Sequence, residues 1–180
     1  TAMAMLRYVL GAVGLAVLLL AREGTSAIRP PRPGIHLLRG LGVAMATCGF
    51  FSAIFVMPLA EATAVTFSSP MLTTLLAAVL LGEPHRRETW LATLVAFAGV
   101  LIVLRPNFAA IGWLALLPLL SAVGMSVLVL GNRMVSGLAS PLAMQAFVAG
   151  VAAPMLVLAA VAGHVSGFEP LHIGWPHWSV

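Results

Sequence analysis

The chain has 180 residues, of which 61% are hydrophobic and only 8% are charged, and its mean hydropathy is +1.08. A soluble domain carries about a quarter charged residues, because a surface that faces water needs them. The composition therefore excludes a soluble globular protein and indicates an integral membrane protein whose main partner is the lipid bilayer.

The formal net charge of +4 comes from nine arginines and five glutamates. Such an excess on a soluble protein would suggest nucleic acid, but here the arginines stand between apolar runs, where a membrane explanation is stronger. We therefore expect no nucleic-acid partner. The single cysteine, Cys48, excludes a framework of internal disulfides.

Six apolar runs are candidates to cross a hydrocarbon core of ~30 Å as helices. In chain order they are Ala2–Ala21, Leu38–Met57, Ala60–Leu81, Trp90–Leu104, Ile111–Leu130 and Leu142–Ala162. Around the fourth run only 16 uncharged residues separate Glu88 from Arg105, so it needs flanking residues to complete a span. Because none of the runs alternates as barrel strands do, the predicted fold class is an all-α polytopic helical bundle.

The arginines predict the orientation of the bundle. If the spans alternate, one side holds Arg22, Arg29, Arg32, Arg39, Arg86, Arg87 and Arg133, whereas the other holds Arg7 and Arg105. Cytoplasmic loops carry the excess of basic residues, so the arginine-rich loops are predicted to be cytoplasmic in a multi-pass protein of the inner (plasma) membrane. Arg7 is expected to snorkel outward, and the tail after Ala162 to form an external loop.

The third span, Ala60–Leu81, has two contrasting faces. Small or hydroxylated residues recur at helical spacing along one face, namely Ala62, Thr66, Ser69, Thr73 and Ala77, while Phe67, Met71, Leu75 and Ala78 fall opposite. Pro70 removes a backbone donor, so the carbonyl of Thr66 needs another partner in lipid. This face is typical either of helix packing or of the lining of a polar pathway, with Pro70 as a kink or hinge.

Other spans carry related features. Gly40, Ala44, Cys48 and Ser52 form a stripe of small residues along the second span, which allows close contact between helices. Proline also interrupts the fifth and sixth spans, at Pro118 and Pro154, a pattern suited to moving helices.

Glu61 lies at the external end of the third span and admits two interpretations. It is a candidate for proton or cation coupling, or an acid that complements the positive end of the helix dipole. His164, Glu169, His172 and His177 lack the spacing of a zinc site, and no catalytic set or phosphate loop is present. We therefore expect no metal, no cofactor and no enzymatic activity.

At the level of motifs, "MPLAEATAVTFSSPMLTTLLAAVLLGE" followed by "RRETWLATLVAFAGVLIVLRP" resembles the EamA-like domain of the drug/metabolite transporter superfamily. The resemblance rests on a mid-span proline, a closing Leu-Gly-Glu, a short basic turn, a late glycine and an Arg-Pro exit. "LRYVLGAVGLAVLLLAR" also resembles the second helix of the family, with Arg7 matching an arginine often seen at its start.

The resemblance implies ten helices in two inverted five-helix repeats, of which this chain holds the second to seventh. Residues 1–106 would then form most of the first repeat, and residues 107–180 the start of the second. It also implies that the second, third and fifth spans border a central cavity. The candidate pathway residues in those spans are Ser52, Thr66, Ser69, Pro70, Thr73, Ser121 and Met125.

These features predict a permease that moves small metabolites by alternating access, as an exporter or for uptake of amino-acid or nucleoside-like substrates. The resemblance of "PLAEAT" is to members proposed to move S-adenosylmethionine-like or other small metabolites. The alternative is a structural or regulatory membrane subunit that does not transport, whose small-residue stripes serve only for packing. The oligomeric state is not predicted.

Overall fold

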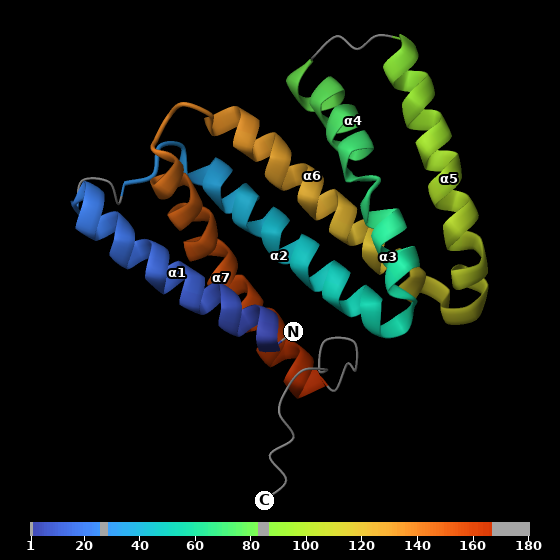
Figure 1. The fold of residues 1–180 in the computed structure, drawn as a ribbon, viewed down its shortest axis with the longest axis horizontal. Coiled ribbons are helices and arrows are strands. Elements are labelled where there is room, and N and C mark those ends of the chain that lie inside the picture. Colours follow the sequence, from blue (N-terminus) through green and yellow to red (C-terminus); the bar gives the residue numbers. More distant parts are fainter. Residues whose placement is uncertain (1, 26–28, 83–86, 167–180) are drawn as a thin grey trace, which may run out of the picture.

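The computed structural model describes residues 2–25, 29–82 and 87–166, and within these ranges the chain forms helices and no strand (Figure 1). The predicted all-α fold class is therefore confirmed. The helices are α1 (Ala2–Glu23), α2 (Pro33–Val56), α3 (Leu59–Thr66), α4 (Ser69–Leu81), α5 (Arg87–Ile111), a short 3₁₀ helix (Gly112–Leu116), α6 (Leu117–Val135) and α7 (Pro141–Ser166).

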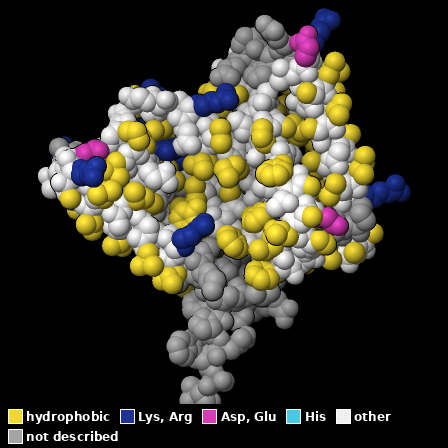
Figure 2. All heavy atoms as spheres, viewed as in Figure 1, with side chains coloured by type: hydrophobic (Ala, Val, Ile, Leu, Met, Phe, Trp, Pro, Cys, Tyr) yellow, Lys and Arg dark blue, Asp and Glu magenta, His cyan; other side chains and the backbone are white. Residues whose placement is uncertain are grey.

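Five segments of the described chain are long and apolar enough to cross a membrane. They are Pro33–Val56, Leu59–Leu81, Arg87–Arg105, Phe108–Val135 and Pro141–Gly163. The first expected span forms α1, a helix of 22 residues that is not among these five, so its crossing of the membrane stays a prediction. Figure 2 shows apolar side chains spread over the visible face with few charges among them, as lipid contact requires.

Two helices extend beyond the predicted spans. α5 continues past Arg105 and Pro106 to Ile111, which gives it the length that Trp90–Leu104 lacked. α2 begins at Pro33 instead of Leu38, because proline suits the first turn of a helix, where its missing N–H costs nothing. Arg39 consequently lies inside α2 and not in a loop, which corrects the expectation from the sequence.

The third span is broken into two helices. α3 ends at Thr66, Phe67 and Ser68 form a turn, and α4 starts at Ser69 with Pro70 in its first turn. The ring of Pro70 disfavours a regular helix at this point, since it clashes with the preceding turn and offers no N–H, although α5 and α7 continue through Pro106 and Pro154. The expected kink is a turn of two residues that stay in the right-handed region.

The centre of the molecule is the contact between α2 and α6, and α2 also packs against α7 (Figure 1). At Gly42, Gly49 and Gly124 the backbones approach so closely that an added Cβ would come within 3 Å of the facing helix. Gly40, which began the predicted stripe, faces Val151 of α7 instead. The predicted close helix contact is present, but the face of α2 that contacts α6 runs through Gly42 and Gly49.

The helices alternate in direction, as the assignment of the arginines to two sides assumed. In Figure 1 the C-terminal ends of α1, α4 and α6 lie toward the same edge as the N-terminal ends of α2, α5 and α7. This edge carries Arg22, Arg32, Arg87 and Arg133, whereas Arg105 lies near the opposite end of α5. The charge asymmetry therefore coincides with the two sides of the bundle.

Candidate functional site

A hollow of about 310 Å³ lies between α1, α2, α3 and α6. This volume falls at the lower end of the range of small-molecule sites, which span about 300 to 1,000 Å³. Its lining combines aromatic and aliphatic side chains with a few polar groups, which is the usual character of such sites. The lining residues are Arg7, Tyr8, Val43, Ala46, Thr47, Phe50, Phe51, Thr66, Ser121, Met125 and Leu128. We call it the central hollow.

Helical periodicity places these side chains on two facing surfaces. On α6, Ser121, Met125 and Leu128 recur at spacings of four and three and so share one face. On α2, the lining residues Val43, Ala46, Thr47, Phe50 and Phe51 also share one face, because they lie three, four, seven and eight positions after the first. Phe50 and Phe51 are at the C-terminal end of this set. The rings of these two phenylalanines lie 6.2 Å apart and nearly perpendicular. The hollow therefore has an apolar, aromatic wall formed by this pair.

Two of the hydroxyls in the hollow donate to backbone carbonyls. Ser121 Oγ donates to the carbonyl of Ala46 at 2.9 Å and so ties α6 to α2. Thr66 Oγ1 donates to the carbonyl of Ala62 at 2.8 Å, one turn earlier in α3. Since each hydroxyl has one proton, both oxygens are left with lone pairs and act as acceptors toward the hollow.

Arg7 and Tyr8 bring a charge and a ring to the hollow from α1. The guanidinium carbon of Arg7 lies 5.2 Å from the centroid of the Tyr8 ring, within the range of a cation–π interaction. Arg7 was expected to snorkel outward; its side chain is exposed and also lines the hollow, so snorkelling stays a prediction. The available signal was an arginine inside an apolar run, since an ionisable group at membrane depth is a functional candidate by default.

The predicted pathway residues divide into two groups. Thr66, Ser121 and Met125 line the central hollow, whereas Ser52, Ser69, Pro70 and Thr73 are not among its lining residues. Ser52 and Thr73 are buried, and Pro70 is exposed on α4. The role of all seven in a pathway stays a prediction.

Hydrogen bonds of the broken span involve the other hydroxyls. Thr73 Oγ1 donates to the Ser69 carbonyl at 2.8 Å, and Ser126 Oγ of α6 lies 2.8 Å from the same carbonyl. Ser126 Oγ is also 2.7 Å from the carbonyl of Ala122 in its own helix. The start of α4 is thus held to α6 next to the interruption.

Glu61 occupies the first turn of α3 and is partly buried. This position fits an acid that complements the positive end of the helix dipole. Glu61 is not among the residues that line the central hollow. Coupling through Glu61 therefore stays a prediction.

Comparison with known proteins identifies the family. The model of the EamA-like transporter family matches residues 1–105. The chain belongs to the EamA-like transporter family. No solved structure shows a significant match to it.

Curated relatives of the EamA-like chain are named as transporters. It is 34% identical over 122 residues to a riboflavin transporter of Rhizobium johnstonii, which covers 68% of this chain and 40% of that protein. It is 29% identical over 110 residues to an S-adenosylmethionine uptake transporter of Rickettsia prowazekii, and the match covers 61% of this chain and 37% of that protein. It is 32% identical over 110 residues to a pseudopaline exporter of Pseudomonas aeruginosa, and the match covers 61% of this chain and 39% of that protein. The chain thus spans about two fifths of the length of these relatives.

A second polar cluster of the EamA-like chain joins α2 to α6 and α7. Arg39, only 3% exposed, donates from Nε to Asn132 Oδ1 at 2.7 Å, and its Nη1 lies 2.8 Å from His36 Nδ1 and 3.9 Å from Met144 Sδ. All three partners are neutral acceptors, and Gly131 leaves room for the Arg39 stem. The counting of Arg39 among the loop arginines missed this role, because its partners are 93 and 105 residues away in sequence.

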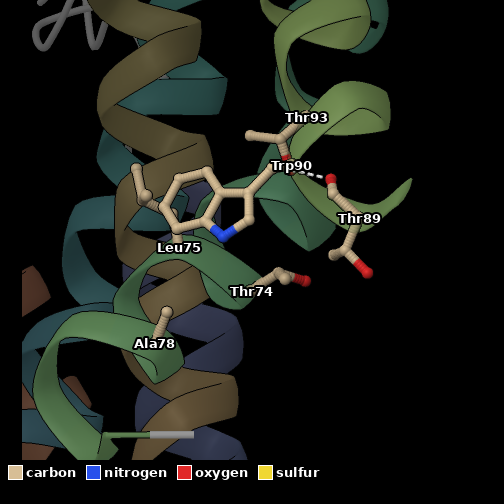
Figure 3. A pocket seen from close by; sticks show the side chains of 6 residues that line it. All are labelled: Thr74, Leu75, Ala78, Thr89, Trp90 and Thr93. Atoms are coloured by element: carbon tan, nitrogen blue, oxygen red, sulfur yellow. Dashed lines mark hydrogen bonds between the residues drawn. The ribbon is translucent and has the colours of Figure 1, made fainter. Parts of the chain in front are cut away.

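A notch between α4 and α5 is a weaker candidate. Figure 3 shows Trp90 reaching from α5 toward Thr74, Leu75 and Ala78 of α4, beside Thr89 and Thr93. The space measures only about 10 Å³, room for about one water. Thr93 donates to the Thr89 carbonyl and Thr74 to the Pro70 carbonyl, so these hydroxyls are engaged within their own helices. The notch is too small for a metabolite.

Proposed function

We propose that the full-length protein is a permease that moves small metabolites across the inner membrane and that the central hollow is part of its pathway. The observation that carries this proposal is the hollow itself, which combines Arg7, three hydroxylated residues and an aromatic wall among apolar helices. Family membership and the names of the relatives support transport as the activity.

The proposed mechanism is alternating access, in which two repeats move about a shared site. The interruption between α3 and α4 provides a point where one half of the span can move against the other. The division into repeats at residues 106 and 107, the ten-helix architecture and the cytoplasmic side of the arginine-rich edge belong to this proposal. Substrates of amino-acid or nucleoside-like size suit the volume of the hollow.

A matched pair of substitutions tests the proposal. Met125 and Leu120 both lie on α6 and are both 41% exposed, but only Met125 is among the residues that line the hollow. In vesicles containing full-length protein, a panel of metabolites is first screened for uptake or efflux. Met125→Trp should fill the hollow and reduce transport at least about tenfold, while Leu120→Trp should leave it within about twofold.

The outcomes separate transport through the hollow from a packing role. If both variants transport like the parent protein, the hollow is not the pathway. If the parent protein moves no member of the panel, the result favours the alternative of a structural or regulatory subunit.

A further inference from the structure

We infer that the central hollow selects metabolites that combine a planar aromatic ring with an anionic group. This inference deepens the proposed transport function and rests on it. It follows from the charge, the donors and acceptors, and the shape of the lining, taken in turn.

The charge of the hollow is positive. Arg7 is the charged residue of the described lining, and no aspartate or glutamate is among the residues named there. The Arg7 side chain is exposed, so an anion can reach its guanidinium. An anionic group is therefore attracted to Arg7, whereas a cationic group is repelled.

Hydrogen bonding gives the hollow both donors and acceptors. The guanidinium of Arg7 offers several N–H donors in a planar fork that suits a carboxylate or phosphate. The hydroxyls of Ser121 and Thr66 donate their hydrogen bonds to the carbonyls of Ala46 and Ala62, so toward a ligand their oxygens act as acceptors. A ligand that carries both an anionic acceptor group and an N–H or O–H donor can pair with both kinds of group, and the hydroxyls of Tyr8 and Thr47 also lie in the lining.

The shape of the hollow favours a flat ring. Tyr8, Phe50 and Phe51 place three aromatic rings in its lining, and the perpendicular pair formed by the last two presents one face and one edge. Aromatic ligands prefer such offset or edge-to-face contacts. The Tyr8 ring also carries Arg7 above it, so the anion-binding group and a ring surface lie side by side.

Three probes with matched structures test this inference on purified full-length protein in lipid nanodiscs. Indole-3-acetate and tryptamine share one ring and carry opposite charges, and cyclohexaneacetate keeps the carboxylate without the aromatic ring. We expect indole-3-acetate to bind at least about tenfold more tightly than tryptamine, since a charged hydrogen bond is worth about this factor or more. It should bind about two- to tenfold more tightly than cyclohexaneacetate, since an aromatic pair adds about this factor beyond burial.

Substitutions test which residues cause the preference for negative charge and the preference for an aromatic ring. Arg7→Gln should reduce the ratio between indole-3-acetate and tryptamine to about one, because the amide keeps polarity and loses charge. Arg22→Gln, on the exposed far end of α1, should leave the ratio unchanged. Phe50→Leu should reduce the preference for indole-3-acetate over cyclohexaneacetate while the preference by charge remains.

The results distinguish this inference from the proposed function. Tryptamine binding as tight as indole-3-acetate, no binding of indole-3-acetate, or an unchanged ratio in Arg7→Gln would overturn the inference. If Met125→Trp nevertheless blocks transport, the pathway stands and only the substrate class is wrong. If Met125→Trp leaves transport intact, the pathway itself is wrong.

Discussion

The Nε atom of Arg39 donates a hydrogen bond to Oδ1 of Asn132 at 2.7 Å and so joins α2 to α6 inside the bundle. A guanidinium buried among neutral partners depends on each of them, since removing one leaves charge without compensation. The contact lies near the edge that carries most of the arginines, where α2, α6 and α7 converge (Figure 1).

We expect Arg39→Gln to lower the free energy of unfolding by about 2–3 kcal/mol, because His36 and Asn132 lose a charged partner. The measurement is the thermal midpoint of purified full-length protein, with Arg22→Gln as the exposed control. A double-mutant cycle with Asn132→Ala should give a coupling energy of about 1–3 kcal/mol. Additive effects of the two substitutions would contradict a direct interaction.

The close contact of α2 and α6 predicts contrasting effects of one substitution at two glycines. An added Cβ at Gly124 would lie 2.5 Å from the backbone nitrogen of Ala46, whereas nothing lies within 4 Å of one at Gly99 on α5. Gly124→Ala should therefore destabilise the protein by about 1–3 kcal/mol through overpacking. Gly99→Ala should be neutral or stabilising by up to about 1 kcal/mol, because alanine favours a helix. Similar thermal midpoints for both variants would show that the helices are not this close.

The interruption at Pro70 predicts a kinetic effect. Pro70→Ala restores an N–H and removes the ring, so α3 and α4 should join more readily into one stiff helix. If the interruption serves as the hinge, the maximal rate of transport should fall at least about fivefold while the substrate concentration at half-maximal rate changes little. Pro154→Ala in α7, where the helix continues through the proline, serves as the control. Equal rates for Pro70→Ala and the parent protein would exclude the hinge.

The position of Glu61 predicts a limited role. Because it lies in the first turn of α3 and outside the lining of the central hollow, Glu61→Gln should leave the pH dependence of transport unchanged. The check is the initial rate in vesicles between about pH 5.5 and 8, where buried or paired carboxyls in transporters often titrate. A flattened profile would instead support proton coupling through this carboxyl.

The features that depend on local periodicity, namely the buried face of a helix and the positions of the spanning helices, were predicted from the sequence. The small and hydroxylated face of the third span is the buried face, with Ala62, Thr73 and Ala77 all buried. The apolar runs also located the spanning helices, since a bilayer demands about 20 apolar residues in any fold. Helix ends were less accurate: the second span was expected to begin at Leu38 but α2 begins at Pro33, and the fourth was expected to end at Leu104 but α5 continues to Ile111.

Contacts between distant segments were beyond reach of the sequence. Arg7 on α1 lines a hollow shared with Ser121 and Met125 on α6, more than a hundred residues later. Nothing in the run around Arg7 reveals which way its side chain turns, since that is decided by the helices beside it. The same holds for Arg39, whose burial depends on Asn132 and Met144.

The most direct test of the central claim is the accessibility of the hollow to a water-soluble thiol reagent. Cys48 is the only cysteine of these 180 residues. Cys48→Ala, combined with alanine at every cysteine elsewhere in the full-length protein, provides a background without thiols, in which Met125→Cys and Leu120→Cys are compared. A charged, membrane-impermeant methanethiosulfonate should modify the cysteine at 125 in vesicles and inactivate transport, but leave the cysteine at 120 in lipid unmodified. Modification of neither, or transport unaffected by modification at 125, would contradict the claim that the central hollow is the pathway.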